Sequence, residues 1–97
     1  MPTYITLASW TQEGIGNIKD SPARLDKVKE MYREAGVELK AFYMTMGRCD
    51  MVVIAQAPND DAIARLALMV GSAGSVRSET LKAFTEEEYR AIVGSLA

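Results

Sequence analysis

The chain is 97 residues long, 48% of its residues are hydrophobic, 25% are charged, and its formal net charge at pH 7 is −2. This composition predicts one globular domain over residues 1–97 and excludes a disordered or low-complexity chain. Because Lys and Arg are neither in excess nor collected into one run, we expect no non-specific binding to nucleic acid.

Histidine is absent, which excludes haem ligation through histidine and any Ser-His or Cys-His nucleophile pair. The run Glu86-Glu87-Glu88 is typical of a helix start, so we expect neither a metal site nor a cofactor. The single cysteine, Cys49, excludes an intrachain disulfide and fits a reducing compartment. With no export signal and no stretch of about 20 apolar residues, the sequence predicts a cytoplasmic protein without a membrane segment.

Residues 4–10 have the pattern of a first strand, with bulky side chains on both faces. The glycine-interrupted stretch 11–20 predicts a crossover with a helical turn capped by Thr11. A helix is then expected to begin with Ser21 as its cap and Pro22 at the first helical position. Its apolar stripe consists of Leu25, Val28, Met31, Tyr32 and Ala35.

Gly36 stands where a left-handed helix cap is expected, and two strands follow, residues 38–46 and 50–56. They are joined through Gly47-Arg48-Cys49, a hairpin length, with a positive φ expected at Gly47. The second of these strands is apolar on both faces.

Asn59 and its neighbours Pro58 and Asp60 are expected to cap a second helix. Its apolar stripe consists of Ala62, Ile63, Leu66, Ala67 and Val70. A turn at 71–75 leads to a fourth strand, residues 76–84. Thr85 and Glu88 then form a capping box that opens a last helix. The stripe expected to be buried on that helix consists of Tyr89, Ile92, Val93 and Leu96.

This order predicts an α+β fold, the ferredoxin-like βαββαβ arrangement with an antiparallel four-stranded sheet and an additional C-terminal helix. Both main helices should then cover one face of the sheet. The other face is also apolar, and soluble monomers rarely expose a patch of that kind. We therefore expect self-association into a homodimer or a higher even-numbered oligomer.

Three stretches resemble the GYD domain family: residues 10–25, the Phe42–Asp50 hairpin and residues 76–85. Gly47 and Asp50 match the family's Gly, Tyr, Asp signature, whereas Cys49 stands where the tyrosine is expected. The resemblance spans essentially the whole chain and implies membership of the dimeric α/β-barrel group. That group includes cofactor-free monooxygenases, isomerases, haem enzymes and ligand-sensing modules, so the resemblance leaves the activity open.

An apolar sheet face with a few polar groups is typical of a small-molecule site. Tyr4, Thr6, Trp10, Tyr43 and Thr45 are expected to share one face with part of the fourth strand. The predicted ligand-binding residues are Tyr4, Trp10, Tyr43, Thr45, Arg48, Asp50, Arg77 and Glu79. The competing interpretation is a dimer interface, in which the aromatic residues and methionines serve as contact area, and the two interpretations are not exclusive.

Arg48 and Asp50 in the hairpin allow two interpretations. In the first, they lie at the edge of a cavity, where Arg48 holds an anionic group and Asp50 acts as a base or orients the turn. In the second, Arg48 is solvated and Asp50 accepts hydrogen bonds from turn amides. Three functions remain open. The first is an oligomeric module that binds a small, partly apolar ligand without catalysis. The second is a cofactor-free oxygenase or isomerase in which Asp50 or Glu79 takes a proton. The third is a purely structural homo-oligomer.

Overall fold

The computed structural model describes residues 1–97 and has the predicted order of elements. The strands are β1 (Thr3–Trp10), β2 (Glu38–Met44), β3 (Met51–Gln56) and β4 (Val76–Ala83). The helices are α1 (Gln12–Gly16), a 3-10 turn (Ile18–Asp20), α2 (Ser21–Glu34), α3 (Asp60–Ser72) and α4 (Glu86–Gly94).

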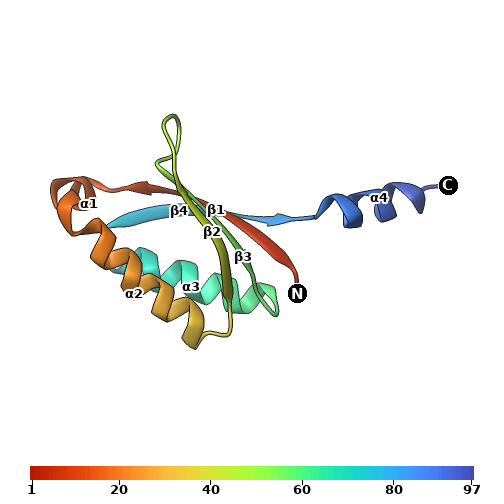
Figure 1. The fold of residues 1–97 in the computed structure, drawn as a ribbon, viewed down its shortest axis with the longest axis horizontal. Helices are drawn as coiled ribbons and strands as arrows, with labels where there is room; N and C mark the ends of the chain where they lie inside the picture. The colour runs from red at the N-terminus through yellow and green to blue at the C-terminus, as the bar shows by residue number, and fades with distance from the viewer.

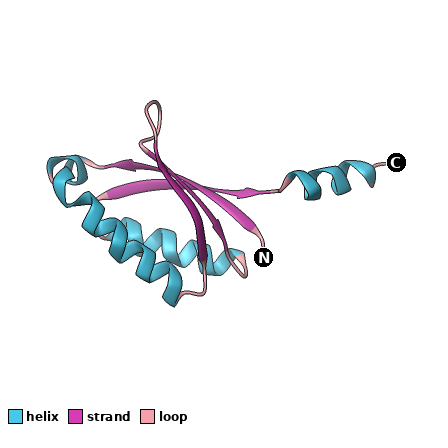
Figure 2. Cartoon of the chain, in the orientation of Figure 1, coloured by secondary structure: helices cyan, strands magenta, loops and turns pink.

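The four strands form one antiparallel sheet in the order β2-β3-β1-β4, and α2 and α3 lie together against one of its faces (Figures 1 and 2). This confirms the α+β, ferredoxin-like fold with its additional C-terminal helix.

The core lies at one end of the layer between the sheet and the helices. Tyr4 from β1, Ala55 from β3 and Leu66 from α3 are among its buried residues, and Leu66 is only 1% exposed. They meet Tyr32 and Val37, which lie at and just after the end of α2. The core therefore closes the end of the layer where β1 begins and α2 ends.

The helix starts follow the local signals with one exception. Thr11 accepts from the Gly14 amide, Asn59 accepts from the Ala62 amide, and the Thr85–Glu88 capping box is complete. The predicted Ser21 cap is wrong, because Ser21 is already the first residue of α2. Its hydroxyl instead accepts a hydrogen bond from Trp10 Nε1 at 3.2 Å.

Both turn glycines have the predicted positive φ, 74° at Gly36 and 138° at Gly47. The hairpin connection is longer than expected, since β2 ends at Met44 and β3 begins at Met51. An irregularity in the β2–β3 pairing between Leu39 and Ala41 turns Leu39 toward the core, whereas simple alternation predicts it on the same face as Ala41.

The face of the sheet opposite the helices is apolar over β1 and β3, as predicted. Ile5, Leu7, Val52 and Ile54 are half-buried there, and Leu81 on β4 is 41% exposed. We call this surface the open sheet face.

Helix α4 contradicts the prediction of a buried stripe. Tyr89, Ile92 and Val93 are all exposed, and α4 projects beyond the end of the sheet (Figures 1 and 2). β4 ends beside the start of α3, where Lys82 meets Asp60, and the capping box at Thr85 starts α4 beyond that point, away from α2 and α3. No helix of the chain has both the length and the apolar character needed to cross a membrane.

Candidate functional site

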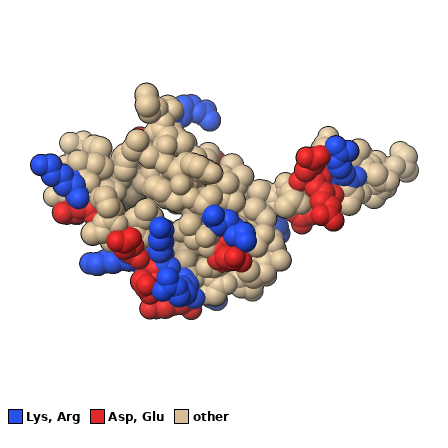
Figure 3. Space-filling view, viewed as in Figure 1, with Lys and Arg blue, Asp and Glu red and all other residues tan.

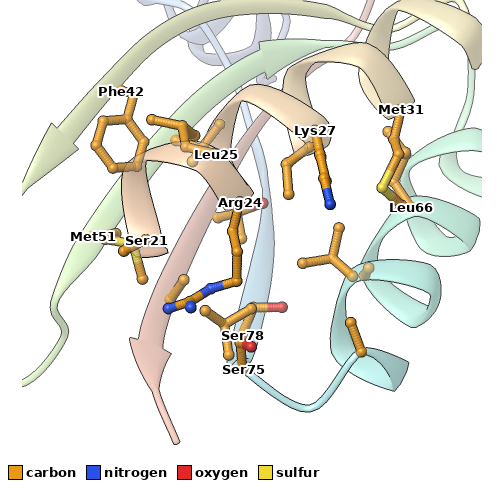
Figure 4. A pocket seen from close by; sticks show the side chains of 18 of the residues that line it. Ser21, Arg24, Leu25, Lys27, Met31, Phe42, Met51, Leu66, Ser75 and Ser78 are labelled. Carbon is orange, nitrogen blue, oxygen red and sulfur yellow. The ribbon is translucent and has the colours of Figure 1, made fainter. Parts of the chain in front are cut away.

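A cavity of about 660 Å³ lies between the sheet and the two helices and extends from the start of α2 to the core, where Tyr32, Val53, Ile63 and Leu66 border it. Of its 26 lining residues, 18 are hydrophobic, so most of a bound molecule would contact apolar surface. Figure 4 shows Arg24, Lys27 and Met31 on α2 facing this space, with Leu66 on α3. The space-filling view shows a hollow between the strands and the helices (Figure 3).

The floor of the cavity is the helix-covered face of the sheet. β1 contributes Thr6 and Trp10, β2 contributes Phe42, and β3 contributes Met51. These residues share a face because Thr6 and Phe42 both pair with Val53. The first turn of α2 is tied to this floor by the Trp10–Ser21 hydrogen bond.

Arg24 is placed on the stripe of α2 that faces the sheet, with Ser21, Val28 and Met31 at steps of three and four residues. Its Nη1 donates to the carbonyl of Asn17 at 3.1 Å, and its Nη2 donates to that of Gly14 at 3.3 Å. Both acceptors are neutral backbone groups, so the guanidinium is held in place and keeps its charge.

A close backbone contact closes the cavity wall beside Arg24. Thr11 N donates to Ser75 O at 3.0 Å, and a Cβ placed on Gly14 would lie 2.0 Å from the same oxygen. Only glycine allows this approach, which brings the β1–α2 connection against the turn before β4. Ser75 and Ser78 line the cavity from that side.

The cavity is positively charged. Arg24 and Lys27 are its charged lining residues, and no Asp or Glu lines it. The ion pairs of the structure are Arg33–Glu30, Lys40–Glu38, Lys82–Asp60 and Arg90–Glu86, so neither lining cation is paired. Burial raises the pKa of the Tyr32 phenol, which is therefore neutral at physiological pH.

The predicted site residues do not share one face. Tyr4 and Trp10 lie on the helix-covered face, and Trp10 lines the cavity. Tyr43 pairs with Val52, which pairs with Leu7, so it lies on the open sheet face. Glu79 pairs with Leu7, and Arg77 lies two residues away on β4, so both are on the open face as well. The prediction that Tyr4, Trp10 and Tyr43 share a face is wrong, because the pairing register separates them.

The remaining predicted site residues lie in the hairpin loop. The Asp50 carboxylate accepts the Trp10 amide at 3.1 Å, and the Asp50 amide donates to Ala8 O at 2.9 Å, which ties the loop to β1. Thr45 Oγ1 donates to Cys49 O at 2.8 Å. Arg48 is exposed. The bonding of Asp50 is structural, although its partner is the neighbouring strand and not a turn amide.

A second polar cluster lies on the α3–β4 side of the sheet, beside a smaller cavity of about 530 Å³. The Tyr4 hydroxyl donates to the Asp60 carboxylate, and Lys82 Nζ lies 3.3 Å from the same carboxylate. The Tyr4 bond and the Lys82 charge lower the pKa of Asp60, and the bond to Asp60 raises the pKa of Tyr4 to about 12. Since it starts from the core residue Tyr4, this cluster anchors β4 to the core.

Sequence reasoning missed the residues of α2 that line the cavity, Arg24 and Lys27 above all. The sequence did contain a signal for Arg24. It is a charged residue on the same face of the helix as the apolar residues Val28 and Met31. A charge on a buried stripe needs either a partner or a ligand.

Comparison with solved structures supports the fold. A feast or famine regulatory protein from M. tuberculosis, solved with L-methionine, superposes with a TM-score of 0.66 at 15% identity over 88% of this chain. A protein from Thermus thermophilus superposes with a TM-score of 0.57 at 21% identity, covering 88% of this chain and 95% of its own. The chain spans about half the length of the regulatory protein, of which it covers 51%.

Sequence comparison gives a nearer relative. A glutamine synthetase and cystathionine beta-lyase binding protein from Thermus thermophilus is 36% identical over 84 residues, which are 86% of this chain and 88% of that protein. The family model of the GYD domain matches residues 4–93. The chain therefore belongs to the GYD domain family.

Proposed function

We propose that this chain is a small, non-catalytic, self-associating module that binds a mostly apolar small molecule in the cavity between the sheet and α2 and α3. The cavity itself is the observation that supports this function. Its volume of about 660 Å³ lies within the roughly 300–1,000 Å³ typical of ligand pockets, and its lining is apolar with few polar groups. Of the site residues predicted from the sequence, Trp10 lines this cavity, and we propose it as a ligand contact.

The geometry gives less support to a cofactor-free oxygenase or isomerase. That reading needs Asp50 or Glu79 as a base in an apolar cavity. Asp50 is bonded to the Trp10 amide, and Glu79 lies on the other face of the sheet. No carboxylate lines the cavity, so proton removal from a ligand there has no candidate base.

Ligand binding is tested with the neutral fluorescent probe Nile red. We expect saturable binding of one probe per chain. Val28→Trp places an indole in the cavity and should abolish binding, whereas Ala23→Trp, on the exposed side of the same helix, should leave it unchanged. Equal binding by the two variants would contradict the proposed site.

Self-association is proposed through the open sheet face, with α4 packing on the second copy. Tyr43, Arg77 and Glu79 would then be interface residues. Leu81 on this face and the stripe of Ile92 and Val93 on α4 are exposed apolar surface in a single chain. The charged side chains in Figure 3 gather over α2 and on α4, with few over the strands.

Sedimentation analysis tests the assembly, for which we expect an even number of chains. Leu81→Glu should dissociate it, and the matched control Leu68→Glu, at an exposed position on α3, should not. A monomer at tens of micromolar wild-type protein would contradict the proposal.

We propose the cytoplasm as the compartment of this protein. Its single cysteine, Cys49, is free and half-buried, which fits a reducing compartment.

A second candidate function is binding to enzymes, favoured by the 36% identity to a glutamine synthetase and cystathionine beta-lyase binding protein. Surface plasmon resonance with each of these two enzymes from the organism of this chain tests it. Saturable binding would support this second function. No binding to either enzyme would contradict the proposal that this chain binds the same enzymes as its relative.

A further inference from the structure

The cavity has a charge imbalance that an apolar ligand alone does not explain. Two cations line it, Arg24 and Lys27, and no anion does. Neither takes part in any ion pair of the structure. A positive charge beside an apolar wall attracts an anion more strongly than it would in bulk water, because the local dielectric constant is lower.

Arg24 is prepared to hold such an anion. A guanidinium has five N–H donors, and the bonds to Asn17 O and Gly14 O use two of them. These bonds fix the orientation of the group without neutralising it. The unused donors are available to a carboxylate, which the planar guanidinium binds with two parallel hydrogen bonds.

The surroundings of Arg24 suit a polar head group with an apolar tail. The contact between Gly14 and Ser75 brings the turn before β4 to the carbonyl that holds Arg24 Nη2. Ser21, Ser75 and Ser78 add hydroxyl groups to the lining (Figure 4). Phe42, Met51 and Val70 line the cavity from β2, β3 and α3 and provide apolar surface.

We infer that the cavity selects anionic amphiphiles, molecules with an apolar body and one carboxylate or similar anionic group, and that Arg24 binds the anionic group. This inference rests on the proposed ligand-binding function and specifies the ligand class. Arg48 and Arg77 were the arginines predicted at the ligand site, but Arg48 is exposed in the hairpin loop and Arg77 lies on the open sheet face. Arg24 is therefore the arginine that binds the anionic group under this inference.

Octanoate and its neutral counterpart 1-octanol test the inference by competition with Nile red. They share an eight-carbon chain, so their difference isolates the charge. Wild-type protein should bind octanoate about tenfold more tightly than 1-octanol, as expected for a charge-assisted hydrogen bond. Arg24→Met should reduce that preference to less than twofold while Nile red still binds. The control Arg65→Met removes an equal charge from an exposed position of α3 outside the lining and should keep the preference.

The outcomes separate the two proposals. If Nile red does not bind the wild-type protein, the cavity is no ligand site and the proposed function fails. If Nile red binds but octanoate and 1-octanol compete equally, the binding function stands and the anion inference is overturned. If Arg24→Met retains the full octanoate preference, the inference is overturned, and the role of Arg24 is to donate hydrogen bonds to the carbonyls of Gly14 and Asn17.

A measurement on the wild-type protein covers the case in which Arg24→Met does not fold. Octanoate affinity should fall as NaCl rises from about 0.02 to about 0.5 M, because salt screens the attraction. The affinity for 1-octanol should not fall over the same range. A parallel response of the two compounds would overturn the inference.

Discussion

The two ends of the layer between the sheet and the helices are built from the same strands and helices, yet one is packed and the other is hollow. At the packed end Tyr4, Ala55 and Ala57 are buried near the end of α2, and Leu66 lies where this end borders the cavity. At the hollow end the same sheet face leaves about 660 Å³ open beside Trp10 and Arg24. Under the proposed function, the packed end supplies stability and the hollow end binds the ligand.

The largest expected effect is at the packed end. Leu66→Ala should lower the free energy of unfolding by about 3 kcal/mol, because the side chain is only 1% exposed and its loss removes buried methyl groups and enlarges the void beside them. Urea denaturation followed by circular dichroism measures it. Leu68→Ala, at an exposed position on the same helix, is the control and should change stability little. A small loss for Leu66→Ala would show that the packed end is not the stable part.

The wall of the hollow end is expected to be rigid even though its interior is open. Gly14→Ala places a Cβ 2.0 Å from Ser75 O and should cost about 2 kcal/mol, since backbone must move to accept it. Gly16→Ala meets no atom within 4 Å and serves as the control, with no loss expected. Thermal melting of both variants makes the measurement, and equal melting temperatures would contradict the close contact.

A leucine-to-alanine substitution should lower the free energy of unfolding less at the hollow end. Leu25→Ala should lower the free energy of unfolding by about 1 kcal/mol, because Leu25 is partly exposed and already borders open space. The urea titration used for Leu66→Ala gives a direct comparison. Equal losses for the two variants would mean that the hollow end is filled or collapsed in solution.

The smallest expected effect is a pH dependence of the Tyr4–Asp60–Lys82 cluster beside the packed end. The Tyr4 hydrogen bond and Lys82 lower the pKa of Asp60 in the folded chain below its unfolded value of about 3.9. The resulting stabilisation is present above the unfolded pKa and is lost as the pH falls through the folded one.

Asp60→Asn should therefore make stability depend less on pH between about pH 5 and pH 2. Urea titrations at several pH values measure the slope, with Asp61→Asn as the control, an exposed neighbour without an ion pair. An unchanged slope for Asp60→Asn would show that the cluster does not contribute to folding.

The sequence by itself determined the elements and their order, because the signals for them act over a few residues. The capping box at Thr85, the Asn59 cap and the positive φ of Gly36 and Gly47 were all predictable in this way. The order of elements then limited the topology to the ferredoxin-like sheet, and the resemblance to the GYD family agreed with it.

Only the tertiary structure decided which residues meet. Pairing register placed Tyr43 with Leu7 and away from Trp10, and the irregularity after Leu39 changed the face of that residue. The cavity lies where side chains of the sheet, α2 and α3 face one another without filling the space, and α4 is exposed because it continues beyond the end of β4, away from the other helices. These features depend on contacts between residues far apart in the chain, which hydrophobic periodicity does not encode. The charged Arg24 on an apolar helix stripe was visible in the sequence, and its position beside open space was not.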